Sequence, residues 1–208
     1  MTNRALLLVD LQNDFCAGGA LAVPEGDSTI DIANRLIDHC LARGETVVAS
    51  QDWHPANHGS FASQHQVEPY TQGQLDGLAQ TFWPDHCVQN GEGAALHPLL
   101  QQQAIAAVFH KGENPAIDSY SAFFDNGHRQ KTRLDEWLRQ RDITDLIVLG
   151  EVFSSLMRRR VCDSTTAPML SSSSCCSELS ESFSMAMRIC CSFSAPITST
   201  EIPITTPL

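Results

Sequence analysis

Short apolar runs alternate with amphipathic segments over the first 150 residues of the chain. Four of the runs have strand length, at 5–9, 46–50, 105–109 and 146–149, and the spacing between them predicts helices over 28–43, near 94–103 and around 134–138. Strands this apolar, separated by helices, are typical of a parallel sheet that is covered on both faces. The pattern therefore predicts an α/β fold, with a doubly wound, mostly parallel sheet and helices on both faces.

The helix expected over 28–43 carries the clearest amphipathic signal. Its apolar face is predicted to consist of Ile30, Ala33, Ile37, Cys40 and Leu41. Ser28 is a plausible N-cap, and Gly44 can end the helix because glycine readily adopts a positive φ. The C-terminal end of the helix is thus expected just before a short turn into the second strand.

The chain changes character after Gly150. All 12 glycines and all 8 histidines lie in residues 1–150, whereas residues 151–208 contain serine runs, cysteine pairs and Pro-Ile-Thr repeats. An α/β domain does not usually lose its turn-forming residue halfway, because its crossovers need positive-φ positions. We expect a domain over 1–150 and a divergent Ser/Cys/Thr-rich segment over 151–208 that completes the fold poorly. A displaced reading frame or a replaced C-terminus would explain it, and a disordered Ser/Thr-rich tail is the alternative.

Charge and cysteine usage narrow the class of protein. The net charge of −11 argues against nucleic acid or an anionic membrane as a partner, since either needs a clustered basic surface. No apolar stretch approaches a membrane span and no signal-peptide anatomy is visible, so we expect a cytoplasmic protein. The 8 cysteines show neither zinc-finger spacing nor a disulfide framework. A segment 151–208 that leaves the sheet uncovered would favour homo-oligomers formed through exposed apolar surface.

Ionisable residues follow three of the four predicted strands. Asp10, Asp52 and Lys111 end the first three strands, and Gly150 ends the fourth. The carboxyl ends of parallel strands meet at one edge of the sheet, where ligands of such folds bind. We therefore expect these side chains to converge on one site.

Asp52-Trp53-His54 is a candidate metal motif. In an extended segment residues i and i+2 point the same way, so the Asp52 carboxylate and the His54 imidazole can meet one ion. His86, in Trp83-Pro84-Asp85-His86-Cys87, can complete the set, and His58 is a further candidate. One carboxylate and two imidazoles suit one divalent transition metal, zinc first and iron or manganese as alternatives. The structural alternative is an Asp52 that caps a turn and a His54 that lies in a loop.

Asp10 and Lys111 are the candidate catalytic residues. A carboxylate at the buried mouth of a parallel sheet is desolvated, so its pKa should rise and it can act as a base near neutral pH. Lys111 beside it would hold charge and help to stabilise a developing anion. The alternatives are a turn-capping aspartate and a solvated lysine. Three aromatic residues can line a flat, ring-shaped substrate pocket or simply belong to the core: Phe15, Trp83 and Tyr120.

The segments Val9–Phe15, Asp52–Pro55, Trp83–Val88 and Ser119–Phe123, together with Lys111-Gly112, resemble the nicotinamidase/pyrazinamidase branch of the isochorismatase-like cysteine hydrolases. The resemblance covers residues 1–150 in order. It implies hydrolysis of nicotinamide to nicotinate and ammonia, and of pyrazinamide likewise, in pyridine-nucleotide salvage. It also implies an acid/base role for Asp10, the role of catalytic lysine for Lys111, and metal ligation by Asp52, His54 and His86. His58 corresponds to a ligand in some members only.

The resemblance breaks where such enzymes carry their nucleophile. Their fourth strand runs into a glycine-led turn and then a cysteine at a helix N-terminus, where the helix dipole favours the thiolate. Here Glu151-Val152-Phe153-Ser154-Ser155 follows Gly150, and Leu156 stands where the spacing puts the cysteine. Cys162 lies too late to inherit the role. We therefore expect an impaired amidohydrolase, with a catalytically inactive metal- or pyridine-binding homologue as the alternative.

Overall fold

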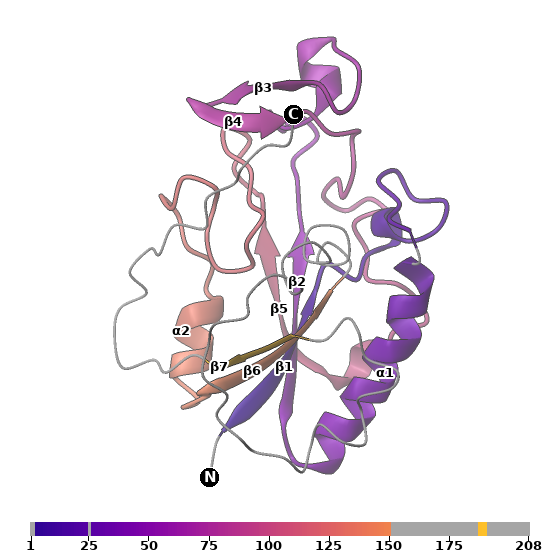
Figure 1. Cartoon of the computed structure of the whole chain (residues 1–208), viewed down its shortest axis with the longest axis vertical. Coiled ribbons are helices and arrows are strands. Elements are labelled where there is room, and N and C mark those ends of the chain that lie inside the picture. The colour runs from indigo at the N-terminus through magenta and orange to yellow at the C-terminus, as the bar shows by residue number, and fades with distance from the viewer. Residues whose placement is uncertain (1–2, 25, 151–186, 191–208) are drawn as a thin grey trace, which may run out of the picture.

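The computed structural model describes residues 3–24, 26–150 and 187–190 (Figure 1). The strands and α-helices, in chain order, are β1 (Arg4–Val9), α1 (Gly26–Ala42), β2 (Thr46–Asp52), β3 (Gln72–Leu75), β4 (Leu78–Thr81), β5 (Ile105–Lys111), α2 (Leu134–Arg139), β6 (Asp145–Gly150) and β7 (Met187–Cys190). Short 3-10 turns lie at Asn13–Phe15, Ala62–His65 and Gln102–Ala104.

The main sheet has the strand order β5-β2-β1-β6-β7. β5, β2, β1 and β6 are parallel, and β7 pairs antiparallel with β6 at one edge. The chain moves outward from β1 through β2 in one direction and later crosses to β6 on the other side of β1. The strand order therefore reverses at β1, and open α/β sheets bind ligands beyond the carboxyl ends of the strands at such a point. The predicted doubly wound, mostly parallel sheet is confirmed.

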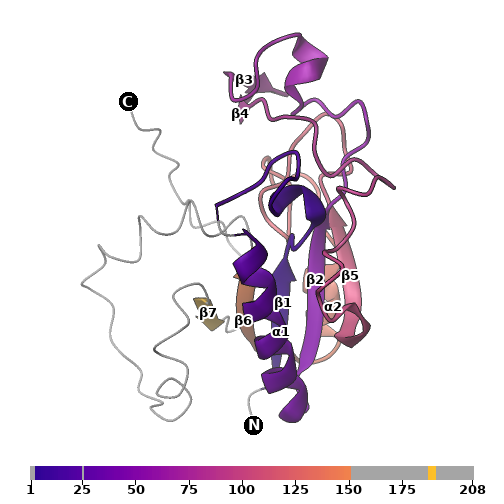
Figure 2. The ribbon, with the colours of Figure 1, turned by 90° about the vertical axis from the view of Figure 1, so that its right-hand side faces the viewer.

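Helices cover both faces of the sheet, as the sequence predicted (Figures 1 and 2). Alternate residues of β1 point to opposite faces of the sheet. Leu6 and Leu8 pack with α1 on one face, whereas Leu7 packs with α2 on the other. Both strand faces are apolar because both are buried, which is why the run reads as continuously hydrophobic. The hairpin of β3 and β4 lies beyond the carboxyl ends of β2 and β5 (Figure 1).

The predicted apolar face of α1 is right except at one position. Leu41 is 47% exposed, and Leu36 takes its place in the core between Ala33 and Ile37. Ser28 was expected to cap the helix, but α1 begins at Gly26, so that expectation is wrong. Gly44 follows the helix with φ +70°, the left-handed conformation expected of a terminating glycine.

The helix predicted near 94–103 is absent; the segment forms turns and the 3-10 turn Gln102–Ala104. Its backbone bonds instead to the loop after β1. The Asn13 N–H donates to the Ala95 carbonyl at 3.0 Å, and the His97 N–H donates to the Leu11 carbonyl at 2.9 Å. These tertiary bonds replace the i to i−4 bonds that a helix would need, so the segment lies along the site.

The expectations for Leu156, Cys162 and the rest of 151–186 and 191–208 concern positions outside the described residues. Of the segment 151–208, only the strand β7 is described, paired with β6. No helix in the described part of the chain is both long enough and apolar enough to cross a membrane.

Candidate metal centre and acid/base cluster

Lys111 joins the two strand-end aspartates. Asp52 and Lys111 are register partners at the ends of β2 and β5, and the Lys111 Nζ lies 2.5 Å from Asp52 Oδ1. The same nitrogen lies 2.9 Å from Asp10 Oδ2 and 3.0 Å from the Ser119 carbonyl. All three ionisable side chains are buried. The ammonium thus has an acceptor for each of its three donors, and the structure brings together the residues that the strand ends were expected to supply.

Asp10 lies in a strained and desolvated position. Its φ of +56° belongs to the left-handed region, which aspartate adopts only at a cost. Its carboxylate accepts a hydrogen bond from the Ser50 hydroxyl at 2.9 Å, and its N–H donates to the Ser50 carbonyl. Burial raises the pKa of Asp10, and the neighbouring Lys111 ammonium offsets only part of that rise. The raised pKa is what the sequence predicted for this carboxylate.

The side chain of Gln12 fixes the end of β2. Its amide oxygen accepts from the Asp52 N–H at 2.8 Å, and its amide nitrogen donates to the Asp52 carbonyl at 2.8 Å. Gln12 has no exposed surface, so these bonds are not shared with water. The Gln12 side chain thus pairs with both backbone groups of Asp52, as a neighbouring strand would, and holds the backbone of Asp52 in place. The sequence analysis assigned Gln12 no role.

His86 reaches the site although it is far from His54 in the sequence. The segment after it runs alongside the end of β2: the His54 N–H donates to the Cys87 carbonyl at 3.0 Å, and the Gln89 N–H donates to the His54 carbonyl at 2.8 Å. The rings of His54 and His86 lie 5.0 Å apart. His54 Nε2 also lies 3.6 Å from Asp52 Oδ1.

The predicted metal set fits a metal ion. One ligand atom each from Asp52, His54 and His86 lies within 4.8 Å of the others, and all three residues are buried. His54 Nδ1 lies 2.9 Å from the Gly112 carbonyl and His86 Nδ1 lies 2.7 Å from the Pro84 carbonyl. A carbonyl accepts only, so each Nδ1 carries the proton and each Nε2 keeps its lone pair. Carbonyl partners of this kind typically orient metal-binding histidines.

Gly112 makes one of those contacts possible. It has φ +68°, and a Cβ at this position would overlap the His54 ring. The backbone can therefore approach the imidazole only without a side chain. The sequence analysis quoted Gly112 in a motif but did not predict this contact.

Two further buried residues adjoin the set. His54, His58 and Asp118 form a second group whose ligand atoms lie within 4.8 Å of one another. The rings of His54 and His58 are 4.2 Å apart. Burial lowers the pKa of both histidines to about 4, so both are neutral at pH 7. His58 was a candidate from the sequence, whereas Asp118 was missed because no motif or strand end marks it.

The three aromatic candidates fall into two groups, Phe15 beside His86 and the pair of Trp83 and Tyr120. Phe15 is buried, with its ring 5.8 Å from that of His86 in an edge-on arrangement. The rings of Trp83 and Tyr120 pair at 6.5 Å, and Tyr120 is 46% exposed. Phe61, which the sequence analysis did not single out, lies within 5.6 Å of His86 by ring centroid.

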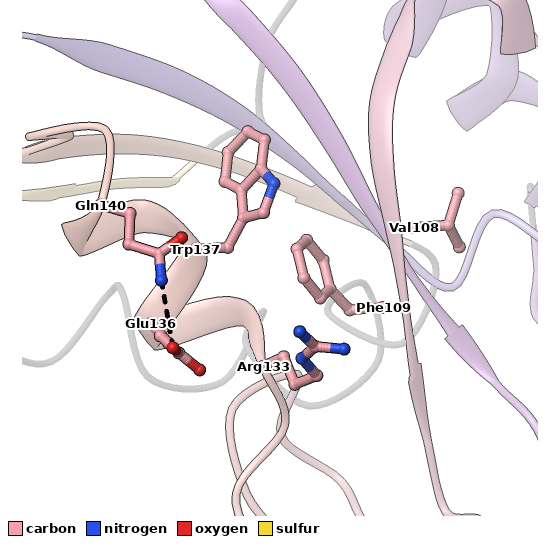
Figure 3. Close-up of a pocket in the computed structure, with 6 residues that line it drawn as sticks. All are labelled: Val108, Phe109, Arg133, Glu136, Trp137 and Gln140. Carbon is pink, nitrogen blue, oxygen red and sulfur yellow. Dashed lines mark hydrogen bonds between the residues drawn. The ribbon is translucent and has the colours of Figure 1, made fainter.

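A cavity of about 290 Å³ lies elsewhere, between α2 and the edge strand β5 (Figure 3). It is lined by Val108, Phe109, Arg133, Glu136, Trp137 and Gln140. The Gln140 amide donates to the Glu136 carboxylate at 3.0 Å on its rim. None of the aspartates, histidines or lysine of the site lines this cavity, so it is separate from their chemistry.

Two of the three cysteines in residues 1–150 are poor nucleophiles. Cys16, Cys40 and Cys87 are buried and form no disulfide. Burial raises the pKa of Cys40 to about 12 and raises that of Cys87 further, so both are thiols at neutral pH. A thiolate is the reactive form. Residues 1–150 therefore bring together a carboxylate–histidine set and an ionic cluster, without a reactive thiolate at Cys40 or Cys87.

A parallel sheet with an ionic cluster beyond its strand ends and a buried carboxylate–histidine set is typical of α/β enzymes whose site can hold a metal ion. Comparison with known proteins identifies the family: the family described as the Isochorismatase domain matches residues 4–155. The chain belongs to this family.

Three relatives illustrate the match. The nicotinamidase of Escherichia coli K12 is 82% identical over 150 residues, which are 72% of this chain and 70% of that protein. The yeast nicotinamidase bound to the inhibitor nicotinaldehyde has a TM-score of 0.66 and 31% identity, over 71% of this chain and 74% of that chain. The pyrazinamidase of Pyrococcus horikoshii in complex with zinc has a TM-score of 0.56 and 35% identity, over 71% and 70%.

Proposed function

We propose that this chain carries the metal and acid/base half of an amidohydrolase that converts nicotinamide, and also pyrazinamide, to the acid and ammonia. The observation that carries the proposal is the Lys111 ammonium, buried between Asp10 and Asp52, with Asp52 also belonging to the carboxylate–histidine set. The 82% identity to the E. coli nicotinamidase supports nicotinamide as the substrate, and such a reaction fits pyridine-nucleotide salvage.

Asp52, His54 and His86 would hold one divalent transition metal. Zinc is the first choice, because neutral imidazoles and a carboxylate suit it and because the P. horikoshii relative was solved with zinc. Iron and manganese accept the same donors. When bound, such an ion can polarise a ligand and orient a pyridine ring nitrogen, directly or through water.

Asp10 and Lys111 would move and stabilise charge. The raised pKa of Asp10 makes its carboxylate a better proton acceptor than an exposed aspartate. The Lys111 ammonium, 2.9 Å from Asp10 Oδ2, stabilises the carboxylate before the proton arrives. Because the whole cluster is desolvated, these electrostatic effects are stronger than they would be in water.

A flat aromatic amide suits the surroundings. We assign Phe15, Trp83 and Tyr120 to substrate binding. The Phe15 ring borders His86, and the Trp83–Tyr120 pair offers a partly exposed aromatic surface. The bound inhibitor of the yeast relative, nicotinaldehyde, carries the same pyridine ring. Aromatic faces of this kind discriminate by shape, with one or two polar contacts to fix orientation.

Turnover also needs a nucleophile, and the chain departs from the family there. The family resemblance puts the reactive cysteine at position 156, where this chain has Leu156, outside the described residues. Loss of a nucleophile typically costs several orders of magnitude in kcat, even when its partners remain. This departure favours a second candidate function, a catalytically inactive homologue that binds metal and pyridine. We assign residues 151–208 to a divergent segment that does not supply the missing group.

The deciding experiment follows nicotinamide turnover as ammonia release. We expect near-background activity from the chain as written. A chimera with residues 151–208 replaced by the matching segment of the E. coli nicotinamidase should gain several orders of magnitude in kcat. Both proteins should bind nicotinamide and a metal ion, since residues 1–150 are common to them.

Cysteine variants provide the controls. Cys16→Ser, Cys87→Ser and Cys162→Ser in the original chain should leave its ammonia release unchanged. Brisk turnover by the original chain that Cys162→Ser abolishes would show that a nucleophile is supplied in another way. An inactive chimera with intact metal binding would refute the assignment of the first 150 residues.

A further inference from the structure

Gln80 is a buried amide on the small hairpin, and the proposed reaction assigns it no role. Only 3% of its surface is exposed, whereas its neighbours in β4 are half-buried or exposed. The hairpin of β3 and β4 lies beyond the carboxyl ends of β2 and β5, at the same end of the sheet as the ionic cluster (Figure 1). A buried side-chain amide needs hydrogen-bond partners, so its contacts show which part of the site the hairpin reaches.

The Gln80 amide nitrogen donates to three acceptors. The Thr81 carbonyl lies at 2.7 Å, Asp118 Oδ2 at 2.9 Å and the Tyr120 hydroxyl oxygen at 3.2 Å. The carbonyl and the carboxylate accept only, so the amide must present its nitrogen here rather than its oxygen. The two hydrogens of this nitrogen are shared among the three partners, and Gln80 thereby ties the hairpin to the loop that contains Asp118 and Tyr120.

That loop contacts the rest of the site through three successive residues. Asp118 accepts from the hairpin amide, and the Ser119 carbonyl accepts from the Lys111 ammonium at 3.0 Å. The Tyr120 ring lies 6.5 Å from that of Trp83, in an edge-on arrangement. The loop therefore joins the ionic cluster to the aromatic pair, and a side chain that fixes the loop also acts on the aromatic pair.

The two rings of the aromatic pair are held in different ways. Trp83 is fixed by its backbone, because its N–H donates to the Ser60 carbonyl and its carbonyl accepts from the Ala62 N–H, both at 2.8 Å. Tyr120 is 46% exposed, and its N–H donates to Asn126 Oδ1 at 3.0 Å. A half-exposed ring keeps rotamer freedom, which a hydrogen bond at its far end restricts. The hairpin amide supplies a bond of this kind.

We propose that Gln80 is a specificity-determining residue of the substrate pocket. By donating to the Tyr120 hydroxyl, it holds the phenol ring edge-on to Trp83 and so sets the width available to a flat ring. The single ring of nicotinamide fits beside the tethered phenol, whereas a fused two-ring amide needs Tyr120 to turn away. The inference rests on the proposed function for the assignment of Trp83 and Tyr120 to substrate binding. Because Gln80 acts through Tyr120, it is a positioning residue.

Binding of two amides to the zinc-loaded full chain tests the proposal, with dissociation constants from calorimetry. Nicotinamide has one ring, and quinoline-3-carboxamide has two. Gln80→Met keeps the length of the side chain but removes its donors, so it should weaken nicotinamide binding by about 5–10-fold. The two-ring amide should lose no affinity, so the preference for nicotinamide should fall by the same factor.

Two further variants separate this tether from a general effect on folding. Tyr120→Phe removes the hydroxyl alone, so it should have the same effect, and adding Gln80→Met to it should change nicotinamide binding by less than about 2-fold. Gln80→Glu puts two carboxylates together, but adding Asp118→Asn restores a donor–acceptor pair with the same total charge. The Tyr120 hydroxyl can donate to the new carboxylate, so this double variant should bind nicotinamide within about 2-fold of wild type.

Gln74→Met is the matched control, since Gln74 is exposed on the facing strand β3 and should leave both dissociation constants unchanged. Circular dichroism checks the folding of each variant, and Tyr120→Phe decides alone if Gln80→Met does not fold. The proposal is overturned if either folded variant keeps the wild-type preference for nicotinamide, or if their effects add in full. A wild type that binds both amides equally overturns this inference only. A wild type that binds neither amide refutes the substrate assignment of the proposed function and this inference with it.

Discussion

Lys111→Met should be among the most destabilising single changes in this chain. The substitution keeps an unbranched side chain of similar length but removes the ammonium that lies 2.9 Å from Asp10 and 2.5 Å from Asp52. Both carboxylates are buried, so neither can recover its hydration. Breaking a buried ion pair by removing one partner costs about 3–5 kcal/mol. With an m-value of about 2 kcal/mol per molar urea, the midpoint should fall by roughly 1.5–2.5 M.

Urea unfolding of metal-free protein at neutral pH, followed by tryptophan fluorescence and circular dichroism, measures the loss. Adding Asp10→Asn to Lys111→Met removes one of the two stranded charges, so the double variant should recover at least about 1 kcal/mol relative to additivity. Lys131→Met is the matched control at an exposed lysine and should stay within about 0.5 kcal/mol of wild type. A cost below about 1 kcal/mol for Lys111→Met would refute the reasoning that the cluster is desolvated.

Three smaller changes test other contacts. Gly112→Ala should cost about 1–3 kcal/mol at its positive φ and should lower metal affinity, because the new Cβ displaces His54; thermal melting and cobalt titration measure the two effects. Gln12→Ala should lower the free energy of unfolding, measured by urea denaturation, by about 1–3 kcal/mol, because it leaves the Asp52 N–H and carbonyl without their partner. An unchanged free energy of unfolding would contradict this role of Gln12. Burial raises the pKa of Glu45, but the Arg4 guanidinium lowers it more, so the net pKa is depressed. The stability that Glu45 contributes is therefore present above its unfolded pKa of about 4.3 and is lost as pH falls through the folded value. Arg4→Met should flatten this acid limb, and an unchanged pH profile of unfolding would count against the ion pair.

The convergence of charged residues was predictable because it depends on strand order alone. Asp10, Asp52 and Lys111 each follow an apolar run, and parallel strands bring their carboxyl ends to one edge. The carboxylate–histidine set was predictable at Asp52 and His54, because residues i and i+2 of an extended segment point the same way. The approach of His86 required tertiary pairing of its segment with the end of β2, which no local pattern encodes.

Two errors concern the secondary structure between β2 and β5. The turn between β3 and β4 is Asp76-Gly77, with φ values of +51° and +79°, and an Asp-Gly pair is a strong hairpin signal. The sequence analysis predicted no strand between 50 and 105, because the residues of β3 and β4 are mostly polar. Apolar residues near 94–103 suggested a helix, but their backbone groups bond to the loop after β1 instead.

Asp118 and Gly112 could not be found from the sequence for a different reason. Their roles arise from what they meet, Gln80 in one case and the His54 ring in the other, and both partners are distant in the chain. An isolated aspartate and an isolated glycine have many ordinary uses in loops. Only the packing of the segments around β2 distinguishes these two.

The order of the sheet strands divides the site between two stretches of the gene. β1, β2 and β5 carry Asp10, Asp52 and Lys111, whereas the chain beyond Gly150 follows β6 on the other flank of β1. A lesion downstream of the Gly150 codon therefore spares every residue that the first stretch contributes. Under the proposed function, a variant of this gene can keep ligand binding while it loses product formation, so a binding screen and an activity screen would score it differently.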